Sequence, residues 1–175
     1  MLGLAAAVPL KTASAAGAGP YLTLQTTKGP IVIRLRPDLA PQSDARLATL
    51  AREGFYDGVV FHRVIAGFMA QTGDPTGTGT GGSKLPDLKA EFTKTPFVRG
   101  TVGMARSADP DSANSQFFIC YAAAPWLNGQ YTVVGEVTSG MKNADELKKG
   151  EGGSGMVAGT PDRVVKATVS NSQPK

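Results

Sequence analysis

Short apolar runs separated by glycine and proline limit the fold of this chain more than any other feature. The 175 residues include 22 Gly and 12 Pro, whereas only 18% are charged and 7% are aromatic. Glycine and proline interrupt helices and supply turns, so this composition suits a loop-rich β protein better than a helical bundle. A chain of this length can bury one substantial core. We therefore expect a single domain of strands joined by turns.

The folded region is predicted to begin with a hairpin. Residues 21–27 and 31–36 are β-rich runs, and Lys28-Gly29-Pro30 between them supplies the turn. In the second run apolar residues alternate with other residues, so one face of that strand is apolar. A helix is predicted next, over 41–53, with Ser43 and Asp44 as candidate N-caps and Gly54 as its end.

The rest of the chain adds strands and one more helix. Two runs are apolar on both faces, which predicts strands covered on two sides, as in a closed barrel with helical lids. The second helix is expected over 141–149, and the glycine-rich segment 73–96 is expected to be a functional or mobile loop. The total is about eight strands and two helices. Besides the hairpin, the predicted strands cover 59–65, 68–72, 101–106, 116–121, 132–137 and 163–170.

Charge and composition exclude several classes of function. The formal net charge is +4, but the basic residues are scattered and lack the interleaved aromatic residues of a nucleic-acid groove. One Cys and one His cannot form a tetrahedral Cys/His metal site, and a single Cys allows no internal disulfide. We expect no metal, no cofactor and no nucleic-acid partner. The apolar run near the N-terminus is too short to span a bilayer.

That N-terminal segment resembles an export signal. An apolar run over 2–10 precedes Ala13-Ser14-Ala15, a small-residue pattern similar to a signal-peptidase site. We therefore expect residues 1–19 to be a disordered leader, residues 20–172 to form the domain, and the protein to be periplasmic or secreted. A cytoplasmic location is the alternative, because no Lys or Arg precedes the apolar run.

Several sequence patterns that indicate a ligand-binding or catalytic site in other proteins do not indicate one in this chain. The glycine-rich stretch 77–84 places Ser before Lys, the reverse of a phosphate-binding loop. His62 is the only imidazole, and strand alternation puts it on the face opposite Arg63. A packed, hydrogen-bonded role is therefore expected for His62. Cys120 lies within an apolar strand, where it is expected to act as a small hydrophobe.

One constellation points to a binding site. Arginine is rarely buried unless it is paired or functional, yet Arg63 lies within the apolar sequence FHRVIAGFMAQT. Gln116 and Phe118 share one strand face, and Met69 and Gln71 share another. Together these residues predict an apolar trough with three hydrogen-bonding side chains, which suits a small ligand or a peptide. Residue spacing alone leaves a purely structural core equally open.

The ordered motifs FHRVIAGFMAQTGD, GTGTGG, GTVGMAR, SQFFIC and WLNGQYTVVGEV closely resemble the cyclophilin family of peptidyl-prolyl cis/trans isomerases. The resemblance extends over about residues 21–170. It implies a mainly β fold, a closed eight-stranded antiparallel barrel capped by two α-helices. It also implies an isomerase that accelerates rotation about X-Pro bonds in peptides and folding proteins, acting as a monomer without metal or cofactor.

The resemblance assigns roles residue by residue. Arg63 becomes the catalytic arginine, and Met69, Phe118 and Leu127 form the proline pocket. The remaining substrate-binding residues are Phe68, Gln71, Ala105, Gln116, Trp126 and Tyr131. Trp126 matches the form of the family associated with cyclosporin, so cyclosporin is an expected ligand.

Two departures resemble bacterial members of the family. Tyr131 stands where many eukaryotic relatives carry His, and the stretch 106–114 differs from theirs. Two alternatives to the isomerase remain. One is a non-catalytic module or chaperone that binds proline peptides in the same trough, and the other is a structural barrel whose interactions lie in the loop 73–96.

Overall fold

The computed structural model describes residues 19–175, so the predicted leader lies almost entirely outside the described residues. Residues 19–175 form eight strands, two α-helices and one 3-10 helix. In order they are β1 (Tyr21–Thr26), β2 (Gly29–Leu35), α1 (Pro41–Arg52), β3 (Arg63–Ile65), β4 (Met69–Thr72), β5 (Thr101–Met104), β6 (Phe117–Cys120), η1 (Pro125–Leu127), β7 (Val133–Ser139), α2 (Met141–Asp145) and β8 (Val164–Ser170).

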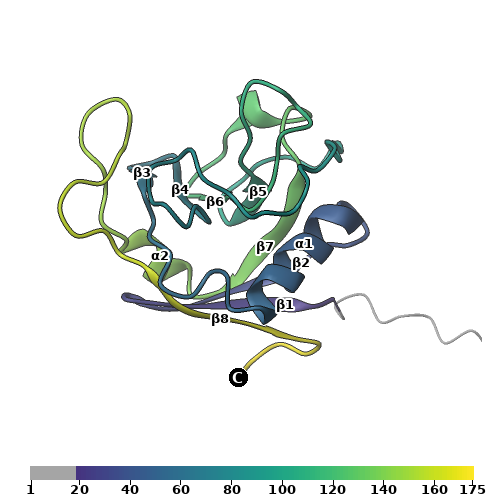
Figure 1. Cartoon of the computed structure of the whole chain (residues 1–175), viewed down its shortest axis with the longest axis horizontal. Coiled ribbons are helices and arrows are strands. Elements are labelled where there is room, and N and C mark those ends of the chain that lie inside the picture. Colours follow the sequence, from purple (N-terminus) through teal and green to yellow (C-terminus); the bar gives the residue numbers. More distant parts are fainter. Residues whose placement is uncertain (1–18) are drawn as a thin grey trace, which may run out of the picture.

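The strands form one antiparallel sheet in the order β3-β4-β6-β5-β7-β2-β1-β8. The sheet curls so that β8 passes beneath the β3–β6 half (Figure 1). The residues that precede the two end strands, β3 and β8, meet through short contacts rather than a full ladder: Val60 bridges Arg163, and the Phe61 amide donates to the Asp162 carbonyl at 2.8 Å. The predicted mainly β, eight-stranded antiparallel fold with two helices is confirmed.

The apolar side chains form two separate cores. The larger fills the curl of the sheet, and fully buried members such as Leu22, Ile33 and Phe117 come from its strands. The helix α1 packs against β8 and α2 packs against β2, each closing a side of this core. A smaller core gathers around Met69 and Phe118 on the outer side of β4 and β6. Strand alternation explains the division, because neighbours along β6 point to opposite faces.

The helix α1 begins differently from the prediction. Its N-cap is Ala40, and no side chain of the helix caps it. Glu91, from the long loop, instead accepts hydrogen bonds from the amides of Gln42 and Ser43 and from the Ser43 hydroxyl, at 2.8–3.0 Å. A carboxylate is well suited to the exposed amides at a helix N-terminus. The expectation that Ser43 or Asp44 caps the helix was therefore wrong, because a residue distant in sequence takes that position.

Three other elements differ from the sequence prediction. The strand expected over 59–65 is regular only from Arg63 to Ile65, and the helix expected over 141–149 ends at Asp145. The early end of the second helix involves a residue distant in sequence, because the Asp162 carboxylate accepts a hydrogen bond from the Lys148 amide at 2.7 Å outside the helix. The 3-10 helix η1 was not predicted. Within residues 19–175, no helix is long and apolar enough to cross a membrane.

Candidate active site

The floor of the candidate site is the smaller core. The Phe118 ring stacks on Phe97, with centroids 5.7 Å apart, and meets Tyr131 edge-on at 6.0 Å. Gly103 pairs with Phe118 across β5 and β6, and a Cβ at Gly103 would lie only 2.7 Å from the Phe118 ring. The absence of a side chain at Gly103 is therefore what lets the Phe118 ring lie flat over β5. The result is a rigid aromatic floor.

A cavity of about 130 Å³ opens above this floor. Strands β3 and β4 supply one wall, β6 supplies the floor, and η1 and the chain after it supply the opposite wall. Met69, Phe118 and Leu127 are buried apolar residues at this cavity, whereas Arg63, Gln71 and Arg106 bring polar groups to it; we call it the apolar cavity after the first three. The residues that line it are Arg63, Phe68, Met69, Gln71, Ala105, Arg106, Phe118, Leu127 and Tyr131.

A chain of side-chain hydrogen bonds orients Arg63. Its Nε donates to the Ser154 carbonyl at 2.9 Å, and its Nη1 donates to Gln71 Oε1 at 3.3 Å. Gln71 Nε2 in turn donates to Gln116 Oε1 at 2.9 Å. Gln116 Nε2 donates to the backbone carbonyls of Gly79 and Gly81. Because these carbonyls can only accept, they fix which way both amides face. The amide oxygen of Gln71 is thereby left as the acceptor that faces the Arg63 guanidinium.

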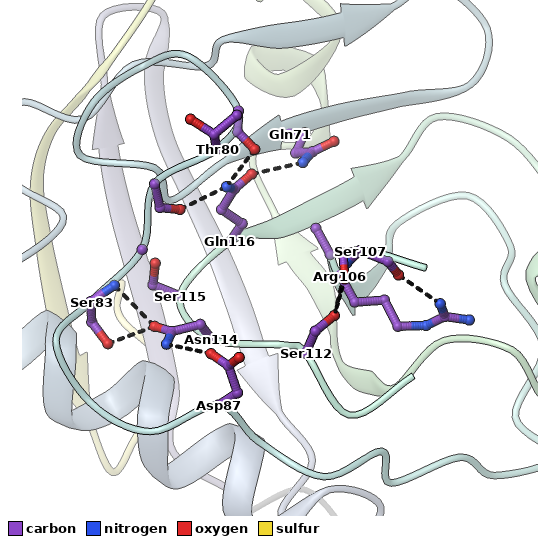
Figure 2. Close-up of a pocket in the computed structure, with 14 residues that line it drawn as sticks. Gln71, Thr80, Ser83, Asp87, Arg106, Ser107, Ser112, Asn114, Ser115 and Gln116 are labelled. Carbon is purple, nitrogen blue, oxygen red and sulfur yellow. Dashed lines mark hydrogen bonds between the residues drawn. The ribbon is translucent and has the colours of Figure 1, made fainter. Parts of the chain in front are cut away.

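A second, larger cavity of about 580 Å³ adjoins the first. The two cavities share three lining residues, Gln71, Ala105 and Arg106. Figure 2 shows Gln71 and Gln116 pointing toward one another at one side of the larger cavity, with Ser83, Asn114 and Asp87 on another side. Its lining is mostly hydroxyl, amide and backbone groups. A bound peptide can extend from the apolar cavity into the larger one past these three residues, which we call the shared ridge.

Arg106 is a lining residue that the sequence analysis did not select. Its guanidinium lies 4.4 Å from the centre of the Tyr131 ring and donates to the Gln130 carbonyl through Nε and Nη2. Its Nη1 donates to the Ser107 carbonyl at 2.9 Å. The only sequence signal was its position next to Ala105, because the stacking partner lies 25 residues further along the chain.

Eight of the predicted site residues line the apolar cavity, and two do not. Gln116 lies in the larger cavity and reaches the apolar one through Gln71. Trp126 is 63% exposed and leans on Phe68, with ring centroids 5.4 Å apart. It therefore lies at the rim, outside the cavity lining. Its predicted substrate-binding role stays a prediction.

His62 and Cys120 are both buried next to the site. Burial lowers the pKa of His62, and nearby Arg63 lowers it further against the opposing effect of Asp74, so the imidazole is neutral at pH 7. Neither of its ring nitrogens has a hydrogen-bond partner among residues 19–175, so the hydrogen-bonded part of the prediction was wrong. Burial raises the pKa of Cys120 to about 12, which makes its thiol inert. Among the described residues, no three His, Cys, Asp or Glu side chains gather as metal ligands.

Comparison with known proteins decides the family. Residues 21–169 match the model of the family "Cyclophilin type peptidyl-prolyl cis-trans isomerase/CLD". The chain belongs to the cyclophilin-type peptidyl-prolyl cis-trans isomerases. A probable peptidyl-prolyl cis-trans isomerase of Brucella suis is 53% identical over 171 residues, which are 91% of this chain and 87% of that protein. The peptidyl-prolyl cis-trans isomerase of Helicobacter pylori is 46% identical over 135 residues, 75% of this chain and 82% of that protein.

Solved cyclophilins share the fold. The cyclophilin AquaCyp293 of Hirschia baltica superposes with a TM-score of 0.75 at 28% identity, over 85% of this chain and 73% of that one. A cyclophilin-type isomerase of Cryptosporidium parvum gives a TM-score of 0.79 at 27% identity, over 88% and 98%. The same Cryptosporidium protein has also been crystallised in the presence of the dipeptide Ala-Pro. The curled eight-stranded sheet and its two helices are thus features of the cyclophilin family.

Proposed function

We propose that this cyclophilin isomerises X-Pro bonds by holding the proline ring in the 130 Å³ cavity while Arg63 donates a hydrogen bond to the imide nitrogen. The observation that carries the proposal is the position of Arg63. Its guanidinium lines the same cavity as Met69 and Phe118, and Ser154 and Gln71 hold it in place. The positively charged guanidinium thus faces a cavity with room for a small ring.

The chemistry requires a donor but no nucleophile. Resonance makes the C–N bond partly double, and the barrier to rotation is roughly 18–20 kcal/mol. During rotation the proline nitrogen loses conjugation and regains a lone pair. A hydrogen bond to that lone pair is stronger in the twisted state than in either planar state, so it lowers the barrier. Each ~1.4 kcal/mol of such preference accelerates rotation about tenfold.

The hydrogen-bond chain makes Arg63 a preorganised donor. The two amides, Gln71 and Gln116, are fixed by backbone carbonyls, so little reorganisation is needed when the imide twists. Lysine would be a poor replacement, since a single ammonium cannot be held by two acceptors in one plane and still reach the substrate. No bond is made or broken, so no metal or cofactor enters the proposal.

Proline-containing peptides and folding proteins are the proposed substrates. The cavity accepts a ring, and the larger polar cavity beside it has room for further peptide residues. The dipeptide Ala-Pro present with the Cryptosporidium relative is a small version of such a substrate. Inhibition by cyclosporin is proposed from the exposed Trp126 at the rim, and loss of activity at saturating drug is its test.

The decisive test is Arg63→Ala, with Arg63→Lys beside it. We expect Arg63→Ala to lower kcat/KM at least about a hundredfold, because the donor to the twisted imide is lost. Arg63→Lys should recover only a small part. The rate is measured by exchange NMR on an Ala-Pro peptide, and Arg52→Ala, a change at the exposed end of α1, serves as the control.

The same variant separates the enzyme from a non-catalytic binding module. Trp126 is the only tryptophan and lies at the cavity rim, so its fluorescence reports peptide binding. Arg63→Ala should still bind proline peptides while losing the rate enhancement. Wild-type binding without any acceleration would instead favour the chaperone or binding-module alternative, and full activity in Arg63→Ala would refute the proposed mechanism.

A further inference from the structure

The apolar cavity carries an unbalanced positive charge. Two of its nine lining residues are arginines, Arg63 and Arg106, and none carries a carboxylate. Within residues 19–175, no carboxylate lies within salt-bridge distance of Arg106, in contrast to Arg36 and Arg99, which pair with Asp38 and Asp145. An unpaired charge at the rim of a cleft exerts its field on whatever binds there.

Arg106 is held rigidly in spite of having no acidic partner. Backbone carbonyls of Gln130 and Ser107 accept from its guanidinium, and the rings of Tyr131 and Phe92 lie 4.4 and 5.9 Å from its central carbon. Carbonyls and aromatic faces orient a guanidinium without neutralising its formal charge. The charge is therefore fixed in position and remains available to a ligand.

The position of Arg106 determines which part of a substrate meets it. Arg106 is one of the three residues shared by the two cavities, and in Figure 2 its side chain extends away from Asp87 and Asn114. The guanidinium thus lies on the Tyr131 side of the shared ridge. A peptide whose proline fills the apolar cavity and whose chain continues into the larger cavity would place the residue attached to the proline next to these shared residues.

The nearby carboxylates do not cancel this field. Asp109 and Asp111 follow Arg106 in the chain, but they are exposed and line neither cavity. Asp109 accepts a hydrogen bond from the Asp111 amide within its own loop, and Asp111 accepts one from the Ala90 amide in the loop 73–96. Asp87 lines only the larger cavity, where it accepts from Asn114.

From these observations we propose that Arg106 is a specificity residue, and that this cyclophilin prefers substrates with an acidic residue, Asp or Glu, directly next to the proline. The inference rests on the proposed function, because it concerns the same proline site. An acidic neighbour is attracted by Arg106 and Arg63, and a basic neighbour is repelled by both. The preference acts on substrate capture and is therefore expressed in kcat/KM.

The test uses two series of blocked pentapeptides, Ala-Xaa-Pro-Ala-Ala and Ala-Ala-Pro-Xaa-Ala, in which Xaa is Glu, Gln or Lys. Exchange NMR measures kcat/KM for each peptide without a coupling protease. At low salt we expect wild type to favour Glu over Lys by about fivefold in at least one series, the effect of a partly exposed charge pair and its repulsive counterpart. In 1 M salt, where the Debye length is about 3 Å, the ratio should fall below about twofold.

Three variants assign the preference to one residue. Arg106→Gln should reduce the Glu/Lys ratio to about twofold or less, and Arg106→Lys should keep most of it. Arg52→Gln changes the net charge equally at an exposed site on α1 and should leave the ratio as in wild type. The Glu/Lys ratio is calculated within each variant before the variants are compared. A general loss of activity or stability in Arg106→Gln therefore cancels.

The outcomes separate the two proposals. If wild type accelerates the Gln peptides but the Glu/Lys ratio is the same in wild type and Arg106→Gln, the specificity role is overturned. The proposed isomerase activity is then unaffected. A Lys preference in both series would overturn it as well. No acceleration of any peptide by wild type would instead refute the proposed function on which the inference rests.

Discussion

At the scale of single residues, Asp44 is a buried carboxyl group without a hydrogen-bond partner among the described residues. Its side chain lies in the first turn of α1 and is 2% exposed, and neither carboxyl oxygen has a hydrogen-bond partner among residues 19–175. Burial, with Glu91 nearby, raises the pKa of Asp44 to about 8. Folding therefore favours the protonated acid. As pH rises from about 4 to about 8, the unfolded chain loses this proton and the folded chain keeps it, so stability decreases across that window.

We predict that Asp44→Asn removes this pH dependence. The variant cannot ionise, so its free energy of unfolding relative to wild type should increase by roughly 3–5 kcal/mol between pH 4 and pH 8. Urea unfolding at several pH values measures the difference. Any cost of the amide itself is the same at every pH, so only the change with pH tests the prediction; parallel stability curves for the two proteins would contradict it.

At the scale of elements, the segment 73–96 is an ordered loop built on one carboxylate. Asp74 is fully buried and accepts hydrogen bonds from the amides of Thr76, Thr78, Gly79 and Gly81 and from the Thr76 hydroxyl. These amide donors, which a phosphate-binding loop would offer to a ligand, are thus occupied by the protein itself. The same loop presents the two carbonyls that orient Gln116. The loop is therefore part of the support for Arg63.

We predict that Asp74→Asn weakens both stability and catalysis. Despite the opposing effect of burial, hydrogen bonds from Thr76 and from loop amides lower the pKa of Asp74 to about 2, so the carboxylate contributes stability above about pH 4 that is lost as pH falls toward 2. At pH 7 the variant should lose about 2 kcal/mol of unfolding free energy. Urea unfolding measures this loss, and exchange NMR should show a decrease in kcat.

The control for this variant is Asp38→Asn. Asp38 is an exposed carboxylate that accepts its side-chain hydrogen bonds from Arg36 and not from the loop, and its loss should cost less than about 1 kcal/mol. Equal effects of the two substitutions on stability would contradict the role assigned to Asp74. Unchanged kcat in Asp74→Asn would show that the loop does not position the amides for catalysis.

At the scale of the whole molecule, the strands of the sheet differ in how many backbone pairs hold them to their neighbours. The strand β1 has a six-residue ladder on each side, with β2 and β8. The strand β3, which carries Arg63, has a three-residue ladder with β4, and on its other side it meets only isolated contacts such as the Arg63–Met156 bridge. Arg63, the proposed catalytic arginine, thus lies on the end strand with the shorter ladder. Local opening is expected where backbone hydrogen bonds are fewest.

We predict that amide hydrogen exchange follows this arrangement. Amides of β1 should exchange only through global unfolding, and those of β3 and of residues 146–162 should exchange faster, through local opening. Exchange followed by mass spectrometry on the native protein measures both. A saturating proline peptide should slow exchange at β3 more than at β1. Equal protection of both strands without ligand would mean that the short contacts close the sheet as firmly as a full ladder.

Sequence patterns predicted the elements well because strand and helix periodicity depends on near neighbours. Alternation located the hairpin and most strands, and apolar spacing located α1. The ordered motifs identified the family and Arg63. The errors arose where distant residues intervene: the Lys148 amide donates to the Asp162 carboxylate outside the helix, which ends at Asp145, and Glu91 replaces the predicted Ser43 or Asp44 as the helix cap.

The sequence by itself therefore determined the strand content, the family and eight of the nine residues that line the apolar cavity. Only the tertiary structure decided which partners meet. Gln71 and Gln116 are 45 residues apart, and their contact depends on the register of β4 with β6. The stacking of Arg106 on Tyr131 and the unpaired ring of His62 arise in the same way. Local patterns record each residue's own preference, whereas charge balance and hydrogen-bond direction belong to groups that only folding brings together.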